Sequence, residues 1–136
     1  MSSTLDASLQ KAVTNIPDCV AAGYVDLSSG MVLSIKTVDS HPSAVIELLA
    51  AATADLFQGP NVSAIERTFR KARGLPENPD HHYFQEIIVN SENLIHVFLR
   101  SKRQLQVAAF VCRKGANLGM VLTKARMSMP EIEAAL

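Results

Sequence analysis

Residues 42–57 form a predicted helix that is apolar on nearly every side, and this feature constrains the fold more than any other. The segment reads PSAVIELLAAATADLF, with Glu47 and Asp55 as its only charges. One stripe at helical spacing contains Val45, Leu48, Leu49, Ala52 and Leu56. A second, adjacent stripe contains Ile46, Ala50, Thr53, Ala54 and Phe57. One stripe can face the chain's own core, but the other needs a second cover, which a domain of this size rarely supplies.

We therefore expect this helix to self-associate, because a second copy of the chain is the most direct cover for a spare apolar face. The expected contacts are Val45, Leu48, Leu49, Ala52, Leu56 and Phe57. The many alanines would let two helix backbones approach closely. The alternative is an internal core helix in which alanine serves helix propensity. Which stripe faces the partner stays open at this point.

Composition excludes several classes of protein. The 136 residues suit a single domain spanning 1–136, and 13 basic residues balance 13 acidic ones, so no bulk charge attracts nucleic acid or an anionic membrane. No apolar run reaches the ~20 residues of a membrane span. Cys19 and Cys112 each sit in an apolar segment, as reduced core thiols do. These features indicate a cytoplasmic protein without a membrane span or a nucleic-acid partner.

Periodicity and turn residues predict the remaining elements. Helices are expected at 4–15, at 62–73 and from about 117 to 126, followed by a weakly helical tail; strands are expected at 19–25, 31–36, 83–89, 94–100 and 105–113. The first two strands form a hairpin and the last three an antiparallel meander. Strand 105–113 is apolar at almost every position, so it should be central, with helices covering both faces of the sheet.

The order of these elements resembles the Roadblock family of dynein-light-chain-like domains. The features that match are the hairpin from Ala22 to Leu33, the alanine-rich helix, the meander from Phe84 to Cys112, and Asn117-Leu118-Gly119-Met120 at the start of the last helix. The resemblance implies a profilin-like α+β fold with a five-stranded antiparallel sheet, the first and last helices on one face and the apolar helix on the other. It also implies dimerisation through the apolar helix and the strand that follows, and binding of a Ras-like small GTPase or a scaffold role.

One departure from the family is an inserted segment at about 59–82, where family members generally have a short loop. It carries the cations Arg67, Arg70, Lys71 and Arg73. These could contact phosphate, an acidic partner or a membrane surface, but a solvated helix face is the simpler interpretation. A second cationic group, Arg100, Lys102 and Arg103, is expected on a solvated hairpin turn.

The strand at 83–89 begins the meander and is expected at a sheet edge. Phe84, Glu86 and Ile88 are the residues that would pair with a second copy there. An uncovered apolar edge promotes pairing or aggregation, which either a symmetry mate or the inserted segment would prevent. The sequence leaves both alternatives open.

Residues with chemical potential do not form a recognisable catalytic set. Adjacent His81 and His82 would point to opposite faces of a strand, and no further ligand stands at metal spacing. The neighbours Asp39-Ser40-His41 seldom converge as a catalytic triad must. Gly115 to Gly119 lacks the Lys-Ser/Thr of a phosphate-binding loop and fits a strand-to-helix turn. We therefore expect no enzyme activity, cofactor or metal.

The sequence thus predicts a non-enzymatic homodimeric regulator or scaffold that could partner a Ras-like small GTPase. The alternative is a ligand-sensing module of profilin-like or PAS-like type, with an apolar pocket between sheet and helix. The ligand-sensing module, unlike the regulator or scaffold, should retain a small molecule when the protein is purified.

Overall fold

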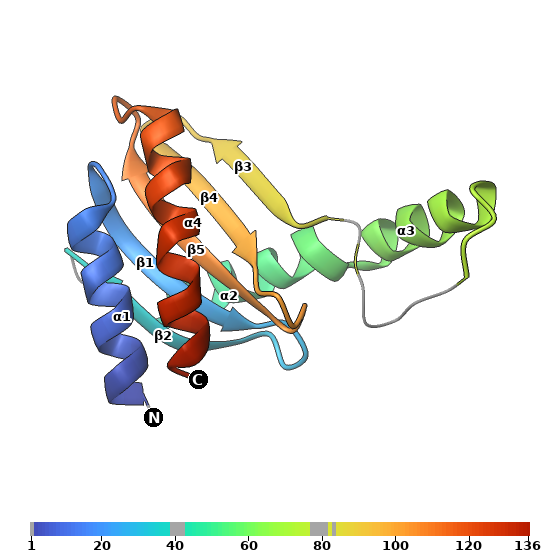
Figure 1. The fold of residues 1–136 in the computed structure, drawn as a ribbon, viewed down its shortest axis with the longest axis horizontal. Helices are drawn as coiled ribbons and strands as arrows, with labels where there is room; N and C mark the ends of the chain where they lie inside the picture. Colours follow the sequence, from blue (N-terminus) through green and yellow to red (C-terminus); the bar gives the residue numbers. More distant parts are fainter. Residues whose placement is uncertain (1, 39–42, 77–81, 83) are drawn as a thin grey trace.

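The computed structural model describes residues 2–38, 43–76, 82 and 84–136. Its elements are α1 (Ser2–Asn15), β1 (Cys19–Asp26), β2 (Met31–Thr37), α2 (Ser43–Gln58), α3 (Pro60–Ala72), β3 (Glu86–Asn90), β4 (Leu94–Arg100), β5 (Gln106–Arg113) and α4 (Leu118–Ala134). The strands form one antiparallel sheet in the order β2-β1-β5-β4-β3 (Figure 1). The α+β fold expected from the sequence is confirmed.

Strand β5 lies in the middle of the sheet, between β1 and β4, as its continuous apolar sequence predicts. Successive side chains of a strand point to opposite faces. Ala108, Phe110 and Cys112 accordingly pack in the core on one face, while Val107 packs in a separate cluster on the other. Both faces of β5 therefore need a cover.

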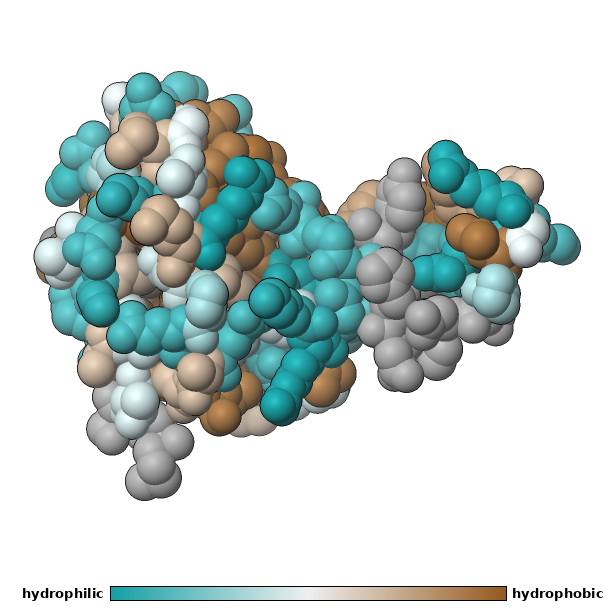
Figure 2. Space-filling view, viewed as in Figure 1, coloured by the Kyte–Doolittle hydropathy of each residue, from teal (hydrophilic) through white to brown (hydrophobic). Residues whose placement is uncertain are grey.

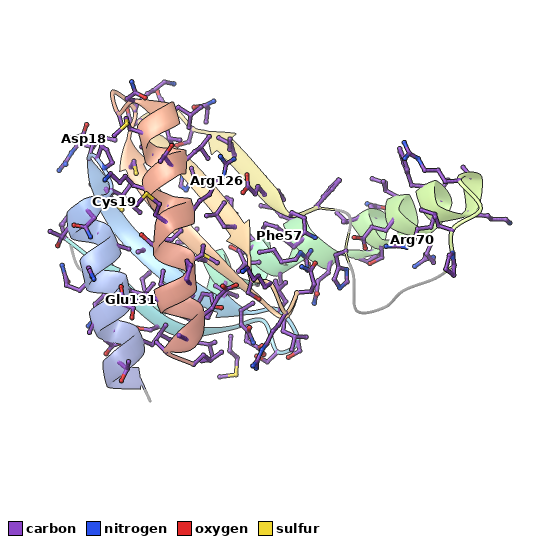
Figure 3. All side chains as sticks on the ribbon, viewed as in Figure 1. Asp18, Cys19, Phe57, Arg70, Arg126 and Glu131 are labelled. Carbon is purple, nitrogen blue, oxygen red and sulfur yellow. The ribbon has the colours of Figure 1, made fainter. Side chains whose placement is uncertain are left out.

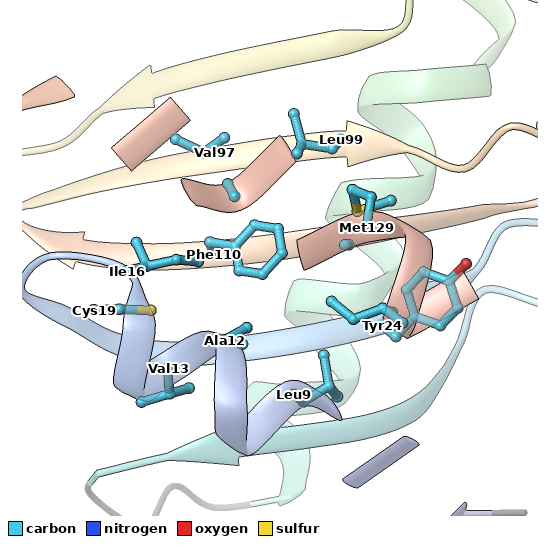
Figure 4. Close-up of a cluster of buried hydrophobic side chains, with 14 of the residues drawn as sticks. Leu9, Ala12, Val13, Ile16, Cys19, Tyr24, Val97, Leu99, Phe110 and Met129 are labelled. Atoms are coloured by element: carbon cyan, nitrogen blue, oxygen red, sulfur yellow. The ribbon is translucent and has the colours of Figure 1, made fainter. Parts of the chain in front are cut away.

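Helices α1 and α4 cover one face and enclose the larger core (Figures 1 and 4). Leu9 and Ala12 of α1 point into it opposite Phe110 of β5, and Val121 and Ile132 contribute from α4. Leu9, Phe110, Val121 and Ile132 are completely buried. The helical spacing of these apolar residues explains why both helices bury one face and leave the other in solvent.

Helix α4 is longer than expected, because it continues past Arg126 to Ala134 with Pro130 inside it. A proline within a helix costs about 3 kcal/mol relative to alanine. Met129 and Ile132, which flank Pro130, are buried and extend the apolar stripe begun by Val121. Packing of the tail onto the sheet therefore outweighs the proline, and the expected end near residue 126 was wrong.

Strand β3 is shorter than expected, since it begins at Glu86 rather than at residue 83. The two residues before β3 make hydrogen bonds with side chains. Arg100 Nε donates to the Phe84 carbonyl at 2.9 Å, and Gln85 Nε2 donates to Gln104 Oε1 at 2.8 Å. One backbone bond still joins this segment to β4, since the Arg100 N–H donates to the Gln85 carbonyl at 2.8 Å. β3 forms one edge of the sheet, as predicted.

Helix α3 stands away from the sheet, on the side of the β3 edge (Figure 1). It follows α2 almost directly, with Gly59 as the N-cap and Pro60 in its first turn, where a missing N–H costs little. None of its residues is buried. The second amphipathic pattern in the sequence is thus a real helix, but it does not belong to either core.

Candidate interaction surface on the α2 face

Helix α2 presents one stripe to the sheet and the other to solvent, which answers the question left open by the sequence. Ala50, Thr53 and Phe57 of the second stripe are buried. Leu48 and Leu49 of the first stripe are 71% and 53% exposed, and Leu56 is 39% exposed. Ala52 is also exposed, while the side chain of Val45 lies outside the described part of the chain. The exposed stripe is the candidate contact surface.

Phe57 does not belong to this surface, which corrects the set expected from the sequence. Its side chain is fully buried. Its ring meets that of Phe98 edge-on, with centroids 6.3 Å apart, and the Arg100 guanidinium carbon lies 5.0 Å from the ring centroid. Figure 3 shows Phe57 at the end of α2 nearest α3. Phe57 therefore attaches the helix to its own sheet and is unavailable to a partner.

Arg100 is buried rather than solvated, so the expected hairpin role was wrong for this residue. Its guanidinium donates to the carbonyls of Phe57 at 2.9 Å, Phe84 at 2.9 Å and Gln104 at 3.2 Å. Burial lowers the pKa of Arg100, yet three carbonyl acceptors satisfy its donors. The available signal was strand alternation, which places Arg100 on the same face as Phe98. Lys102 and Arg103 are exposed, as expected.

A groove of about 440 Å³ runs between α2 and the sheet. Its α2 wall includes Leu49, Ala52 and Leu56, and its floor is formed by strand residues such as Gly23, Val25, His96, Phe98, Ala109 and Val111. Most of these side chains are apolar. Desolvation lowers the pKa of His96, whose Nε2 lies 3.3 Å from the Ser91 hydroxyl. The described residues thus leave the α2 face of the sheet partly uncovered.

The edge strand β3 carries exposed apolar side chains on both faces of the sheet. Val89 pairs with His96, which lines the groove, whereas Ile88 pairs with Val97 of the α1/α4 core. Figure 2 shows hydrophobic surface on the α4 side of the sheet, next to α4. Glu86 forms a two-pronged ion pair with Arg126 of α4, at 2.6 and 3.0 Å, and this hydrogen bonding lowers the pKa of Glu86. Phe84 packs against the cluster around Phe57 instead of in the strand. The edge therefore remains accessible at β3.

The cations of α3 do not converge on one point. Arg73 lies over the Phe69 ring at 5.0 Å, and Arg70 donates to the Pro76 carbonyl at 3.2 Å. Arg67 and Lys71 are exposed, and Figure 3 shows Arg70 on the helix remote from the sheet. This arrangement supplies a basic helix surface rather than a closed anion site.

The residues considered for chemistry are dispersed. His82 Nδ1 lies 3.3 Å from Glu66 Oε1, while His81 and Asp39-Ser40-His41 lie outside the described residues. Asn117 caps α4 by accepting from the Met120 N–H at 3.0 Å, which is the strand-to-helix turn expected there. Among the described residues no group of three metal-ligating side chains occurs. In the same residues, no helix combines the length and apolar character required to cross a membrane.

Cys19 and Cys112 are free, buried thiols, as the sequence predicts. They lie directly opposite each other on β1 and β5. A hydrogen bond between the two side chains lowers the pKa of Cys19 and raises that of Cys112. They belong to the core beneath α1 and α4 and are remote from the α2 face.

Comparison with solved structures identifies the fold. The gliding protein MglB from Thermus thermophilus superposes with a TM-score of 0.70 at 18% identity, over 98% of this chain and 88% of that chain. A Roadblock/LC7 domain from Streptomyces avermitilis matches with a TM-score of 0.65 at 14% identity, over 95% and 94% of the two chains. The chain has the Roadblock/LC7 fold.

Other structures with this fold give the same result. MglB from Myxococcus xanthus matches with a TM-score of 0.68 at 16% identity, over 99% of this chain and 92% of that one. None of the family models and none of the curated proteins compared matches the sequence. At these identities the likeness establishes the Roadblock/LC7 fold, and the role of the α2 face has to be argued from its residues.

Proposed function

We propose that the protein is a non-enzymatic homodimer, in which the exposed stripe of α2 packs against the same stripe of a second copy. The observation that supports this most directly is the exposure of Leu48, Leu49 and Leu56 on a well-formed helix beside an open groove. Burying such side chains is worth about 1.5–3 kcal/mol each before the entropic cost of association. Pairing of the β3 edges, which the Roadblock resemblance implies, would bring the two stripes together. A structure of MglB described as tetrameric has the same fold.

We further propose that the dimer regulates or scaffolds a Ras-like small GTPase in the cytoplasm, as one domain with an inserted segment. The Roadblock resemblance is the support for the GTPase, and the buried reduced thiols support the location. A composite surface needs both subunits, so losing the dimer should abolish GTPase binding. Leu48→Lys is the suitable variant, because Leu48 is 71% exposed and a lysine there stays in solvent.

The experiment measures binding of Ras-like GTPases from the same organism, loaded with GDP or a GTP analogue, by calorimetry. Wild type should bind one of them, and Leu48→Lys should lose this binding while keeping its helical circular dichroism. Lys124→Glu on α4 serves as a charge-changing control away from α2. If wild type bound none of these GTPases, the proposed GTPase partner would be wrong, whether or not the protein is a dimer.

A second candidate function is supported by the groove, whose volume of about 440 Å³ is in the range of small-molecule sites. In this alternative an apolar molecule occupies the space between α2 and the sheet. It predicts that protein purified under mild conditions releases a small molecule on denaturation, detectable by mass spectrometry. Native protein that is dimeric and empty would favour the first proposal.

A further inference from the structure

We propose that Cys19 and Cys112 form a redox site, which closes to a disulfide within the chain when the protein meets hydrogen peroxide. Cys19 begins β1 and Cys112 lies near the end of β5, so the fold rather than the sequence brings them together. The site lies in the core beneath α1 and α4. It goes beyond the proposed dimer on the α2 face and does not depend on it.

The backbone places the two residues as a disulfide requires. They lie directly opposite each other in the antiparallel pairing of β1 with β5. In the adjacent pair the Arg113 N–H donates to the Asp18 carbonyl at 3.0 Å, and the Cys19 N–H turns instead to the Ile16 carbonyl at 3.3 Å. Bonded and non-bonded pairs alternate along an antiparallel ladder, so Cys19 and Cys112 form a non-bonded pair, the class with Cα atoms about 4.5 Å apart. Natural disulfides span Cα separations of about 4.4–6.8 Å.

The side chains of the pair are already in contact. Both belong to the same core cluster, so they project from the same face of the sheet. Cys19 Sγ donates to the Ala21 carbonyl at 3.2 Å, which leaves its lone pairs free to accept from the Cys112 thiol. This bond between the thiols lowers the pKa of Cys19 and raises that of Cys112. The two sulfur atoms can therefore join without a movement of the strands.

The two thiols differ in access and in acidity, and this difference assigns the order of events. Cys19 is 8% exposed and lies beside Ile16 (Figure 4), whereas Cys112 is completely buried. The thiolate is the nucleophilic form of cysteine, and Cys19 has the lowered pKa. Hydrogen peroxide is small and uncharged, which suits a thiol with so little exposed surface. Cys19 is thus the thiol that reacts first, and Cys112 is the resolving thiol.

The reaction balances with hydrogen peroxide as the oxidant. The Cys19 thiolate attacks one peroxide oxygen, the O–O bond breaks, and the departing hydroxide takes up the proton that Cys19 lost, so Cys19 becomes a sulfenic acid. The Cys112 sulfur then attacks the Cys19 sulfur. The S–S bond forms, the S–O bond breaks, and the second hydroxide leaves as water with the Cys112 proton. Two thiols are oxidised to one disulfide, and one peroxide is reduced to two waters.

The test treats wild type with hydrogen peroxide at the lowest concentration that oxidises Met127, a methionine that is 67% exposed. Peptide mapping by mass spectrometry should then find the peptides of Cys19 and Cys112 joined, with the loss of two hydrogen atoms. The melting temperature should rise by about 5–15 °C, because the cross-link closes a long loop of the unfolded chain. Dithiothreitol should reverse the rise, since it reduces a disulfide but leaves methionine sulfoxide in place.

Two single variants test the order of the steps. Cys112→Ser keeps a donor to Cys19 but cannot form the disulfide, so the Cys19 sulfenic acid should be trapped by dimedone. In the matched variant Cys19→Ser, Cys112 should stay a free thiol under the same treatment. The wild-type peptide map decides the proposal even if one of these variants does not fold.

Several results would overturn the proposal. Free thiols at both cysteines after Met127 has been oxidised would show that peroxide does not reach the pair. A disulfide between two copies, or a sulfinic acid at Cys19 without a cross-link, would show that Cys112 is not the resolving thiol. Dimedone on Cys112 in the Cys19→Ser variant would contradict the assigned order. A melting temperature that falls on disulfide formation would mean that the two thiols are not placed to join.

Discussion

The two faces of the sheet differ in how completely one chain covers them. On one face, α1 and α4 enclose a core in which Leu9 and Phe110 are fully buried. On the other, a single helix buries Ala50, Thr53 and Phe57 while leaving Leu48 and Leu49 in solvent beside a groove. The first face accounts for folding. The second face leaves apolar side chains exposed among the described residues, and our proposal of a homodimer rests on this difference.

The largest difference between the two faces of the sheet is expected when a large side chain on each face is replaced by alanine and the free energy of unfolding is measured. Phe110→Ala in the α1/α4 core should lower the free energy of unfolding by about 3–5 kcal/mol. Leu48→Ala on α2 should lower it by less than about 0.5 kcal/mol, because the side chain is 71% exposed. Urea unfolding at low protein concentration measures both. Similar losses for the two variants would contradict the difference between the faces.

The attachment of α2 to the sheet provides the next largest effect. Arg100→Met keeps the aliphatic length but leaves the carbonyls of Phe57, Phe84 and Gln104 without this donor. Buried acceptors without a donor are costly, so we expect a loss of about 2–4 kcal/mol in unfolding free energy. Arg103→Met on the adjacent exposed turn is the control and should cost less than about 0.5 kcal/mol. If Arg100→Met and Arg103→Met had the same melting temperature, other contacts would hold α2 on the sheet.

A smaller effect concerns His96 on the floor of the groove. Desolvation lowers its pKa in the folded state, so the unfolded chain binds more protons near the ordinary histidine pKa of about 6.5. The stability linked to His96 is therefore complete above that pH and is lost as pH falls through this window. His96→Gln should flatten the dependence of the unfolding midpoint on pH between about 5 and 8. An unchanged slope in the variant would mean that water reaches the groove floor freely.

The smallest effect is expected at the surface pair between Glu86 and Arg126. Its oxygens and nitrogens are 2.6 and 3.0 Å apart, but both side chains are exposed, so solvent screens the pair. Hydrogen bonding to Arg126 lowers the pKa of Glu86, which means that its contribution exists above the unfolded glutamate pKa and disappears in acid. Glu86→Gln should shift the melting temperature much less than Phe110→Ala or Arg100→Met. A shift as large as that of Arg100→Met would show that the β3 edge depends on α4.

Much of the fold follows from local pattern, because burial imposes a period on each element. The continuous apolar run of β5 predicts its central place, and the two stripes of α2 are visible in the sequence. Element ends were less predictable where distant groups decide them. The Arg100 side chain binds the Phe84 carbonyl just before β3, and the core contacts of Met129 and Ile132 carry α4 past Pro130.

The candidate surface was only partly predictable for the same reason. Sequence spacing defines Leu48, Leu49 and Leu56 as one stripe, but it cannot show which stripe meets the sheet. Phe57 was assigned to the interface because it is large and apolar, whereas contacts with Phe98 and Arg100 bury it within the chain. Burial of Arg100 likewise depends on three carbonyls from separate segments.

Sedimentation equilibrium of wild type and Leu48→Lys, at protein concentrations well above the expected dissociation constant, tests the central claim that a second copy completes the α2 face. The account predicts a wild-type mass twice the 14.7 kDa of one chain and a folded variant at that single-chain mass. A wild type that remains monomeric, or a Leu48→Lys variant that remains a dimer, would contradict it.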